Sequence, residues 1–231
     1  PRTLVIAEQG SAFTVIEDYV SLTDAPYFTN SVTELALAAN AQVHHIRLQR
    51  ESASAFHIAR CAVTQARDSQ YHSVSIALGS EISRLDTTAL QNGEGTHCAL
   101  DGLAHIAAQQ VADTHTCITH AQAHGTSRQL HKCIVADSAH AVSNGRVQVH
   151  PGAQKIDSAP SSRTLPLGPK ARVNTLPQLE INADDVRCTH GATVGQLDND
   201  ALFYLQSRGL SPEAARRLLT YAFAAEVIGR I

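Results

Sequence analysis

Hydrophobic and polar residues alternate with a period of two from residue 1 to about residue 195. Clear runs of this kind are Phe13–Ile16, Val43–Leu48 and Val74–Leu78, and Gly, Asn, Asp and Ser residues separate them. Alternation over roughly four to eight residues is typical of half-buried β-strands, and the separating residues are typical of turns. The segment 33–40 would suit a helix by propensity, but its leucines alternate, so we predict a strand there as well.

The strand-like runs have no helices between them, although parallel α/β sheets require helices as crossovers. A sandwich, a barrel and a β-solenoid therefore remain as fold classes. A weak internal repeat favours the solenoid, because the pair Cys117 and His124 recurs with the same spacing as Cys133 and His140. The offset of about 16 residues can hold two short strands and their turns, so we interpret it as one coil of a β-helix. A core of stacked small and branched residues agrees with the aromatic content of 4%.

The periodicity changes to 3.6 near residue 196, which predicts two helices after the β-region. Asp198 suits the N-cap of the first helix, and Gly209 suits its end. Pro212 marks the start of the second helix. The broad apolar face of this helix consists of Ala215, Leu218, Leu219, Ala222, Phe223 and Val227. We therefore divide the chain into a β-helix core at 1–196 and a helical subdomain at 197–231.

The composition indicates a folded chain. Of the 231 residues, 43% are apolar and 17% are charged, and the net charge is −3. No window is apolar enough for a membrane span, and the first residues lack the pattern of a signal peptide. The five cysteines form no C-x-x-C pair, so we expect free thiols in the cytoplasm. The chain contains no Met and opens on a strand-like run, which we interpret as a fragment that lacks its N-terminal region.

Several function classes find no support in the residues. The chain is net acidic with three lysines, whereas proteins that bind nucleic acid present a basic face. No P-loop, Rossmann glycine pattern or serine-centred elbow is present, so the chain should not hydrolyse ATP alone. The two predicted helices carry more apolar surface than they can bury on each other. We expect them to pack on the β-region or to dock a partner.

The 13 histidines include close pairs such as His44 with His45 and His120 with His124. Imidazole pairs can contribute to a metal site. No acidic residues gather beside these pairs, however, so we favour structural roles for them.

Cys188 and His190 stand two residues apart on a predicted strand, which places them on one face. A thiolate beside an imidazole is a soft partial ligand set suited to iron or iron–sulfur species. Two ligands cannot hold a cluster, so the others would come from elsewhere or from another chain. From the residues alone, a packed cysteine beside a surface histidine is the favoured interpretation. Nucleophilic Cys–His catalysis lacks a recognisable oxyanion element or orienting carboxylate.

The run from Pro177 to Val227, PQLEINADDVRCTHGATVGQLDNDALFYLQSRGLSPEAARRLLTYAFAAEV, is similar throughout to the C-terminal signature of the SufD family. Segments 29–52, 150–158 and 169–181 also resemble family segments. CTHGATVG, at Cys188–Gly195, is the most specific part, because it has the SufD form and not that of the homologous SufB subunit. The chain is thereby identified as a member of the SufB/SufD family of the Suf iron–sulfur cluster assembly system.

The resemblance implies a right-handed parallel β-helix followed by a helical subdomain, in a non-catalytic scaffold subunit. Such subunits pair with SufB, and nascent iron–sulfur clusters assemble transiently at the shared interface. His190 matches the family histidine implicated as a cluster ligand, and Cys188 matches its neighbour. SufC, an ABC-type ATPase, docks on such subunits through their C-terminal helices. The resemblance therefore assigns a role in docking or helix packing to Leu202, Phe203, Leu218, Leu219 and Phe223. The resemblance leaves open whether the full complex binds flavin. Family members carry a further N-terminal helical region, which we expect to be missing from this fragment.

Two alternatives come from other classes of protein. β-Helix enzymes that act on polysaccharides gather carboxylates and aromatic platforms in a groove, whereas this chain has no Trp and few Tyr or Phe. A self-contained His-rich metal-binding protein would hold metal without a partner. When SufB is missing, we expect the exposed end of the β-helix to pair with a second copy as a homodimer. Truncation of Phe223 to alanine should cost roughly 3–5 kcal/mol if this side chain is buried.

Overall fold

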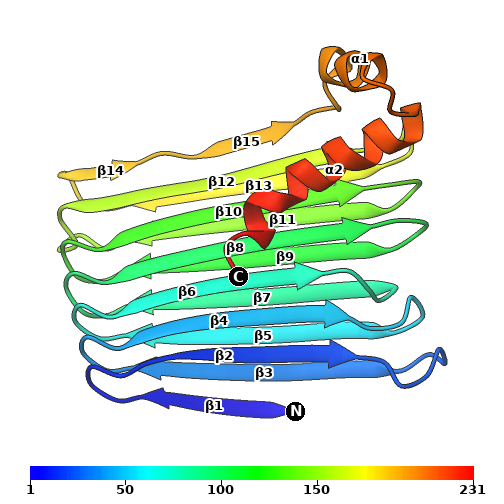
Figure 1. Cartoon of the computed structure of the whole chain (residues 1–231). Helices are drawn as coiled ribbons and strands as arrows, with labels where there is room; N and C mark the ends of the chain where they lie inside the picture. The colour runs from blue at the N-terminus through cyan, green and yellow to red at the C-terminus, as the bar shows by residue number, and fades with distance from the viewer.

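The chain forms a parallel β-solenoid that ends in two helices, and the computed structural model describes all residues from 1 to 231 (Figure 1). Strands alternate between two sheets along the chain. The first sheet contains β1 (Arg2–Ala7), β3 (Phe28–Leu37), β5 (Phe56–Gln65), β7 (Ile82–Gln91), β9 (Val111–His120), β11 (His140–Val149) and β13 (Arg172–Ile181). The second sheet contains β2 (Ala12–Val20), β4 (Gln42–Arg50), β6 (Gln70–Ala77), β8 (His97–Ile106), β10 (Thr126–Val135), β12 (Ile156–Pro166), β14 (Val186–Cys188) and β15 (Gly191–Val194).

All ladders of the solenoid are parallel, and its coil is right-handed. In Figure 1 the strands of the second sheet run left to right in front. Those of the first sheet run right to left behind, while the chain climbs away from its N-terminus. The predicted parallel β-helix is thus confirmed. So is the strand predicted at 33–40, because β3 extends to Leu37.

The coil length predicted from the Cys–His repeat is wrong. Neighbouring coils pair Phe56 with Ile82 and His140 with Arg172, so one coil is nearly twice as long as that offset. Cys117 lies on β9 and Cys133 on β10, in opposite sheets. The offset therefore measures half a coil, because most strands are longer than the short ones that we had expected.

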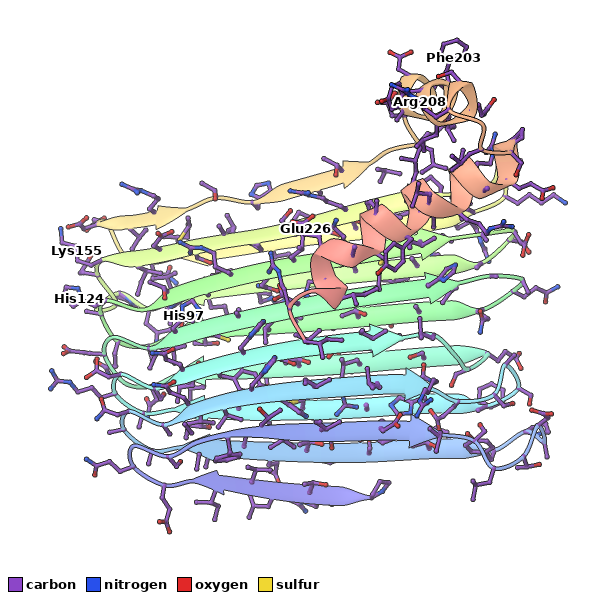
Figure 2. The ribbon with its side chains drawn as sticks, in the orientation of Figure 1. His97, His124, Lys155, Phe203, Arg208 and Glu226 are labelled. Carbon is purple, nitrogen blue, oxygen red and sulfur yellow. The ribbon has the colours of Figure 1, made fainter.

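One corner of the solenoid repeats the same backbone conformation in successive coils, up to the turn between β11 and β12. Where a first-sheet strand leads into a second-sheet strand, one residue has a positive φ, and its N–H donates to a carbonyl of the next coil. Glycine adopts this conformation without steric cost, and asparagine and aspartate tolerate it better than most residues. The residues at this corner are Gly10, Asn40, Asp68, Gly95, His124 and Lys155, the last two of which lie one above the other in Figure 2.

Inward side chains stack from coil to coil and form the core. Equivalent inward positions of the first sheet are apolar in every coil, and each stacks on the next. This column consists of Val5, Leu35, Val63, Ala89, Ile118, Val147 and Leu179. Burial of these small and branched side chains supplies the hydrophobic stabilisation, which agrees with the low aromatic content.

A buried polar network occupies the interior beside this column, near the N-terminal coils. Glu17 accepts hydrogen bonds from Thr33 at 2.7 Å, from the Nε2 of His45 at 2.9 Å and from Arg47 at 2.5 Å. The Nδ1 of His45 lies 2.8 Å from the hydroxyl of Tyr71. Because Nε2 of His45 carries the proton toward Glu17, the Tyr71 hydroxyl is the donor to Nδ1 in the neutral ring. Every member of the network is therefore partnered, as a buried polar cluster requires.

This network predicts an acid-sensitive contribution to stability. Burial alone would raise the pKa of Glu17, but the hydrogen bond from His45 and the charge of Arg47 outweigh it and lower the pKa from 4.5 to about 2. Because the pKa of Glu17 is lower in the folded state than the unfolded value of 4.5, ionised Glu17 stabilises the folded protein at pH values above 4.5. This contribution to stability is lost as the pH falls toward 2. The shift corresponds to about 3 kcal/mol, which solvent screening reduces to about 2. Urea unfolding at pH 5 and pH 2 should show this loss in the wild type but not in Glu17→Gln. Equal pH slopes in the two proteins would contradict it.

The two helices, α1 (Asn199–Ser207) and α2 (Pro212–Ile228), begin and end as predicted. The side chain of Asp198 accepts a hydrogen bond from the N–H of Asp200, and Gly209, with φ of +94°, follows the end of α1. The boundary predicted between residues 196 and 197 lies between β15 and α1. Neither helix is long and apolar enough to cross a bilayer. In Figure 1, α2 lies across the outer face of the second sheet, in front of β8 and β10.

Candidate functional site

The segment that carries Cys188 and His190 forms the last edge of the second sheet. Cys188 ends β14, Gly191 begins β15, and both short strands pair with β12. His190 lies between them and outside any strand. The prediction that Cys188 and His190 share one continuous strand is therefore wrong.

Pro160 explains the interruption between β14 and β15. The register that pairs Ser158 with Cys188 and Ser161 with Gly191 places Pro160 opposite His190. The N–H of Thr189 donates to the carbonyl of Ser158 at 2.9 Å. In a parallel ladder, the N–H two residues after Ser158 would donate back to Thr189. Proline has no N–H, so the ladder breaks at this point.

The two candidate ligands differ in exposure. Cys188 is half-buried and packs against a core cluster that contains Val147, Val149 and Ile156. Burial, and then the carboxylate of Asp157, raise the pKa of the Cys188 thiol. His190 is exposed and available to a molecule outside the chain. In the free protein Cys188 therefore favours the thiol form, and a metal bound there would have to displace its proton.

The chain does not by itself complete a metal site. No group of three or more His, Cys, Asp or Glu side chains is arranged to hold a metal ion. His190 and Cys188 could supply at most part of a ligand set. A cluster bound by them would need further ligands from another molecule, because iron–sulfur clusters are commonly held by four protein ligands.

Several other histidines make contacts within the fold. His45 belongs to the network around Glu17, and His120 is buried with its Nε2 3.0 Å from the hydroxyl of Ser127. Burial lowers the pKa of His120 to about 4, so its ring is neutral near pH 7. His124 is exposed at the repeated corner. His44 and His72 stack with ring centroids 4.8 Å apart on neighbouring strands.

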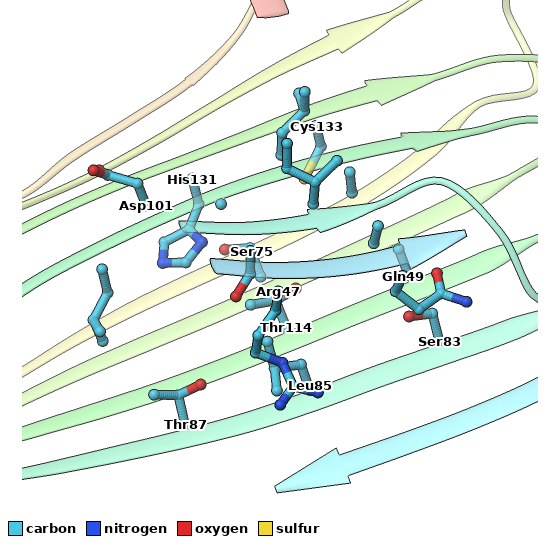
Figure 3. A pocket seen from close by; sticks show the side chains of 18 of the residues that line it. Arg47, Gln49, Ser75, Ser83, Leu85, Thr87, Asp101, Thr114, His131 and Cys133 are labelled. Atoms are coloured by element: carbon cyan, nitrogen blue, oxygen red, sulfur yellow. The ribbon is translucent and has the colours of Figure 1, made fainter. Parts of the chain in front are cut away.

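An internal cavity of about 50 Å³ lies between the two sheets (Figure 3). Hydroxyl groups line much of it, including those of Ser75, Thr87 and Thr114. Gly102 leaves room for the ring of His131, since a Cβ at Gly102 would lie 2.5 Å from its Nδ1. Pockets that bind organic ligands usually measure about 300–1,000 Å³, so this cavity does not accommodate a sugar or an organic cofactor.

The helical residues predicted for docking or packing fall into two groups. Leu202 is buried, and Leu219 and Phe223 are half-buried. Phe203 and Leu218 are 74% and 45% exposed, and Figure 2 shows Phe203 on the side of α1 that faces away from the solenoid. Because Phe223 is only half-buried, its truncation should cost less than the roughly 3–5 kcal/mol expected for a buried phenylalanine.

A buried lysine on β10 holds α2 against the sheet, and sequence reasoning missed it. Lys132 is 4% exposed at its side chain, and its Nζ lies 2.6 Å from Oε2 of Glu226. The same Nζ donates to the carbonyl of Phe223 at 2.7 Å and lies 4.5 Å from the centroid of the Phe223 ring. Near the end of α2, Arg230 donates to the buried Asp101 at 2.6 Å. The sequence did offer a signal for this contact, because Lys132 stands between Leu130 and Ile134 at a position that the alternating pattern of β10 assigns to the same face.

The fold and this edge define a parallel β-solenoid with Cys188 and His190 at its last coil and a helical pair on one face. The chain belongs to the family described as SUF system FeS cluster assembly, SufBD core domain, whose profile matches residues 1–223. It is 42% identical to the iron–sulfur cluster assembly protein SufD of Escherichia coli, over 95% of this chain and 52% of that protein.

Two further relatives show similar agreement. An iron–sulfur cluster assembly SufBD family protein of Synechocystis is 43% identical over the whole of this chain and 53% of its own length. The chloroplastic protein ABCI7 of Arabidopsis thaliana is 39% identical over 99% of this chain and 48% of its own length. The chain thus spans about half the length of these relatives. The resemblance to SufD inferred from the C-terminal signature is confirmed.

Proposed function

We propose that the chain is a non-catalytic scaffold subunit in iron–sulfur cluster assembly, which pairs with a SufB homologue and docks a SufC-type ATPase. Membership of the SufBD core family supports the assembly role. The observation that carries the proposal is the exposed His190 beside the half-buried Cys188 on the last sheet edge. Such an edge gives a partner both unpaired backbone groups and a partial ligand set.

At this edge the nascent cluster is cargo shared between two chains. His190 would offer a neutral imidazole nitrogen to iron, and Cys188 would offer its sulfur once its proton is displaced. The partner would supply the remaining ligands. A site divided in this way assembles only when both chains are present and releases its cargo when they separate.

The helical pair would carry the ATPase. Phe203 and Leu218 are large exposed apolar side chains, which on a helical surface favour a protein contact. Lys132 and Arg230 bind α2 to the solenoid, so a force applied to the helices would be transmitted to the sheet. ATP hydrolysis would belong to the partner.

Co-expression with the SufB and SufC homologues of the same organism tests this function. Affinity purification through the present chain should recover both partners, and a purified complex loaded with iron and sulfide should show the charge-transfer absorption of an iron–sulfur cluster. Without SufB, we expect the free sheet edge to produce a homodimer, which sedimentation would detect. Failure to recover either partner would reject the scaffold function.

A further inference from the structure

A pocket of about 20 Å³ lies between the two sheets in the last coils, next to the larger internal cavity. Its lining comes from β10, β11, β12 and β13, together with Gly191, the first residue of β15. His131 and Ser143 line both spaces, and Figure 3 shows the ring of His131 at the wall of the larger one. All residues around the small pocket are polar residues, glycines or prolines, so its surface suits a polar ligand.

The small pocket exists because a glycine occupies an inward position of β11. The ladders stack Gly145 between Thr116 of β9 and Pro177 of β13. A Cβ at Gly145 would lie 3.5 Å from Oγ1 of Thr116 and 3.9 Å from Oε1 of Gln129, which are ordinary contact distances. A methyl group would therefore fit. Glycine in the middle of a strand weakens it and often marks a place where another group approaches the backbone.

Three polar atoms of the pocket lining are buried without a hydrogen-bond partner in the protein, namely Nε2 of Gln129, Nε2 of His131 and Oγ of Ser162. Gln129 is 3% exposed, and its Oε1 already accepts a hydrogen bond from the hydroxyl of Thr116 at 2.7 Å. Ser162 is the ladder partner of His131 on the next coil. Leaving a buried polar group unpaired costs free energy, so three such atoms around one pocket indicate a ligand that pairs with them.

The charge state of the lining favours a neutral ligand. Burial lowers the pKa of His131 to about 4, although the carboxylate of Asp101 acts in the opposite direction, so the ring is neutral near pH 7. A neutral imidazole has one donor and one acceptor nitrogen, the amide nitrogen donates, and a hydroxyl can do either. No Lys or Arg lines the pocket, so a buried anion would have no cation beside it. The ligand should therefore be small, neutral and able both to donate and to accept.

We propose that this pocket is a binding site for one resident water molecule, held by Gln129, His131 and Ser162. A buried water needs roughly 10–15 Å³ of such space and makes about three hydrogen bonds, and the pocket provides both. On the same scale the larger cavity has room for about three more waters among its hydroxyl groups. The water joins β10 to β12 beneath Gly191, so it supports the coil on which the edge with His190 rests. This inference does not depend on the proposed partners.

Substitutions at Gly145 test the inference through the sign of a stability change. Gly145→Ala places a methyl group in the pocket, expels the water and leaves the polar atoms unpaired, so the melting temperature should fall by roughly 4–8 °C. In a dry pocket the same change would fill space and restrict the unfolded chain, and the melting temperature would rise by about 1–4 °C. Gly145→Ser returns a hydroxyl group to the pocket and should recover at least half of the loss. Gly152→Ala is the matched control, since a Cβ there meets no atom within 4 Å, and it should not lower the melting temperature.

A second measurement detects the water directly in the wild-type protein. A nuclear Overhauser effect between bound water and the side-chain amide protons of Gln129 should be present in the wild type and absent in Gly145→Ala. A rise in the melting temperature of Gly145→Ala would overturn the inference. Absence of the Overhauser effect in the wild type would overturn it as well, because a lower melting temperature would then report only a steric clash. If Gly145→Ala does not fold, the wild-type Overhauser effect alone decides.

Discussion

Replacing His190 with alanine is expected to abolish the growth of a SufD-deficient strain that depends on this protein for iron–sulfur clusters. His190 is exposed on the last sheet edge, where no neighbouring group completes a metal site. Loss of one ligand from a shared set leaves the cluster incompletely held, and no other side chain of the chain is placed to replace it. The fold should be unaffected, since the side chain makes no hydrogen bond within the chain. Growth under iron limitation is the measurement.

Three comparisons make the His190 result decisive. His150→Ala removes another exposed histidine, at the turn that follows β11, and should grow normally. Cys188→Ala should have a milder effect, because Cys188 is half-buried and its thiol pKa is raised. Affinity purification must show that the His190→Ala complex still assembles. Normal growth would remove His190 from the mechanism, and a defect together with loss of the complex would make its role structural.

Deleting Asp198–Ile231 is expected to abolish binding of the ATPase while pairing with SufB persists. The deletion removes both helices, including the exposed Phe203 and Leu218 that we assign to docking. It also uncovers Val74, Leu103 and Ile134 and leaves the buried Lys132 without its helical partners. An unpaired buried charge is costly, so the truncated chain should also be less stable. A pull-down in which it still retains the ATPase would contradict the docking role.

A point variant separates docking from stability. Phe203→Asp/Leu218→Asp changes two exposed side chains and leaves the contacts of Lys132 intact. We expect it to lower the ATPase affinity at least tenfold without a change in the melting temperature. Leu22→Asp is the matched control, because Leu22 is 99% exposed near the opposite end of the solenoid. Equal binding by the point variant and this control would show that the ATPase does not use these side chains.

The sequence by itself determined the type and order of the elements. Period-two alternation predicted the strands, because a buried face on a strand recurs every second residue. The ends of α1 and α2 were predicted correctly because capping depends on local residues such as Asp198 and Gly209. The parallel β-helix itself, and the match to the SufD family, were also within reach of the sequence.

Only the tertiary structure decided how the elements meet. The coil length escaped prediction because pairing joins β5 to β7 and β11 to β13, and nothing local states which strands are neighbours. His190 lies outside a strand because of Pro160, which stands opposite it on the adjacent coil. Lys132 is buried because α2, much further along the chain, returns over it. In each case the deciding contact is with a residue distant in sequence, so no local pattern of hydrophobic and polar residues carries the information.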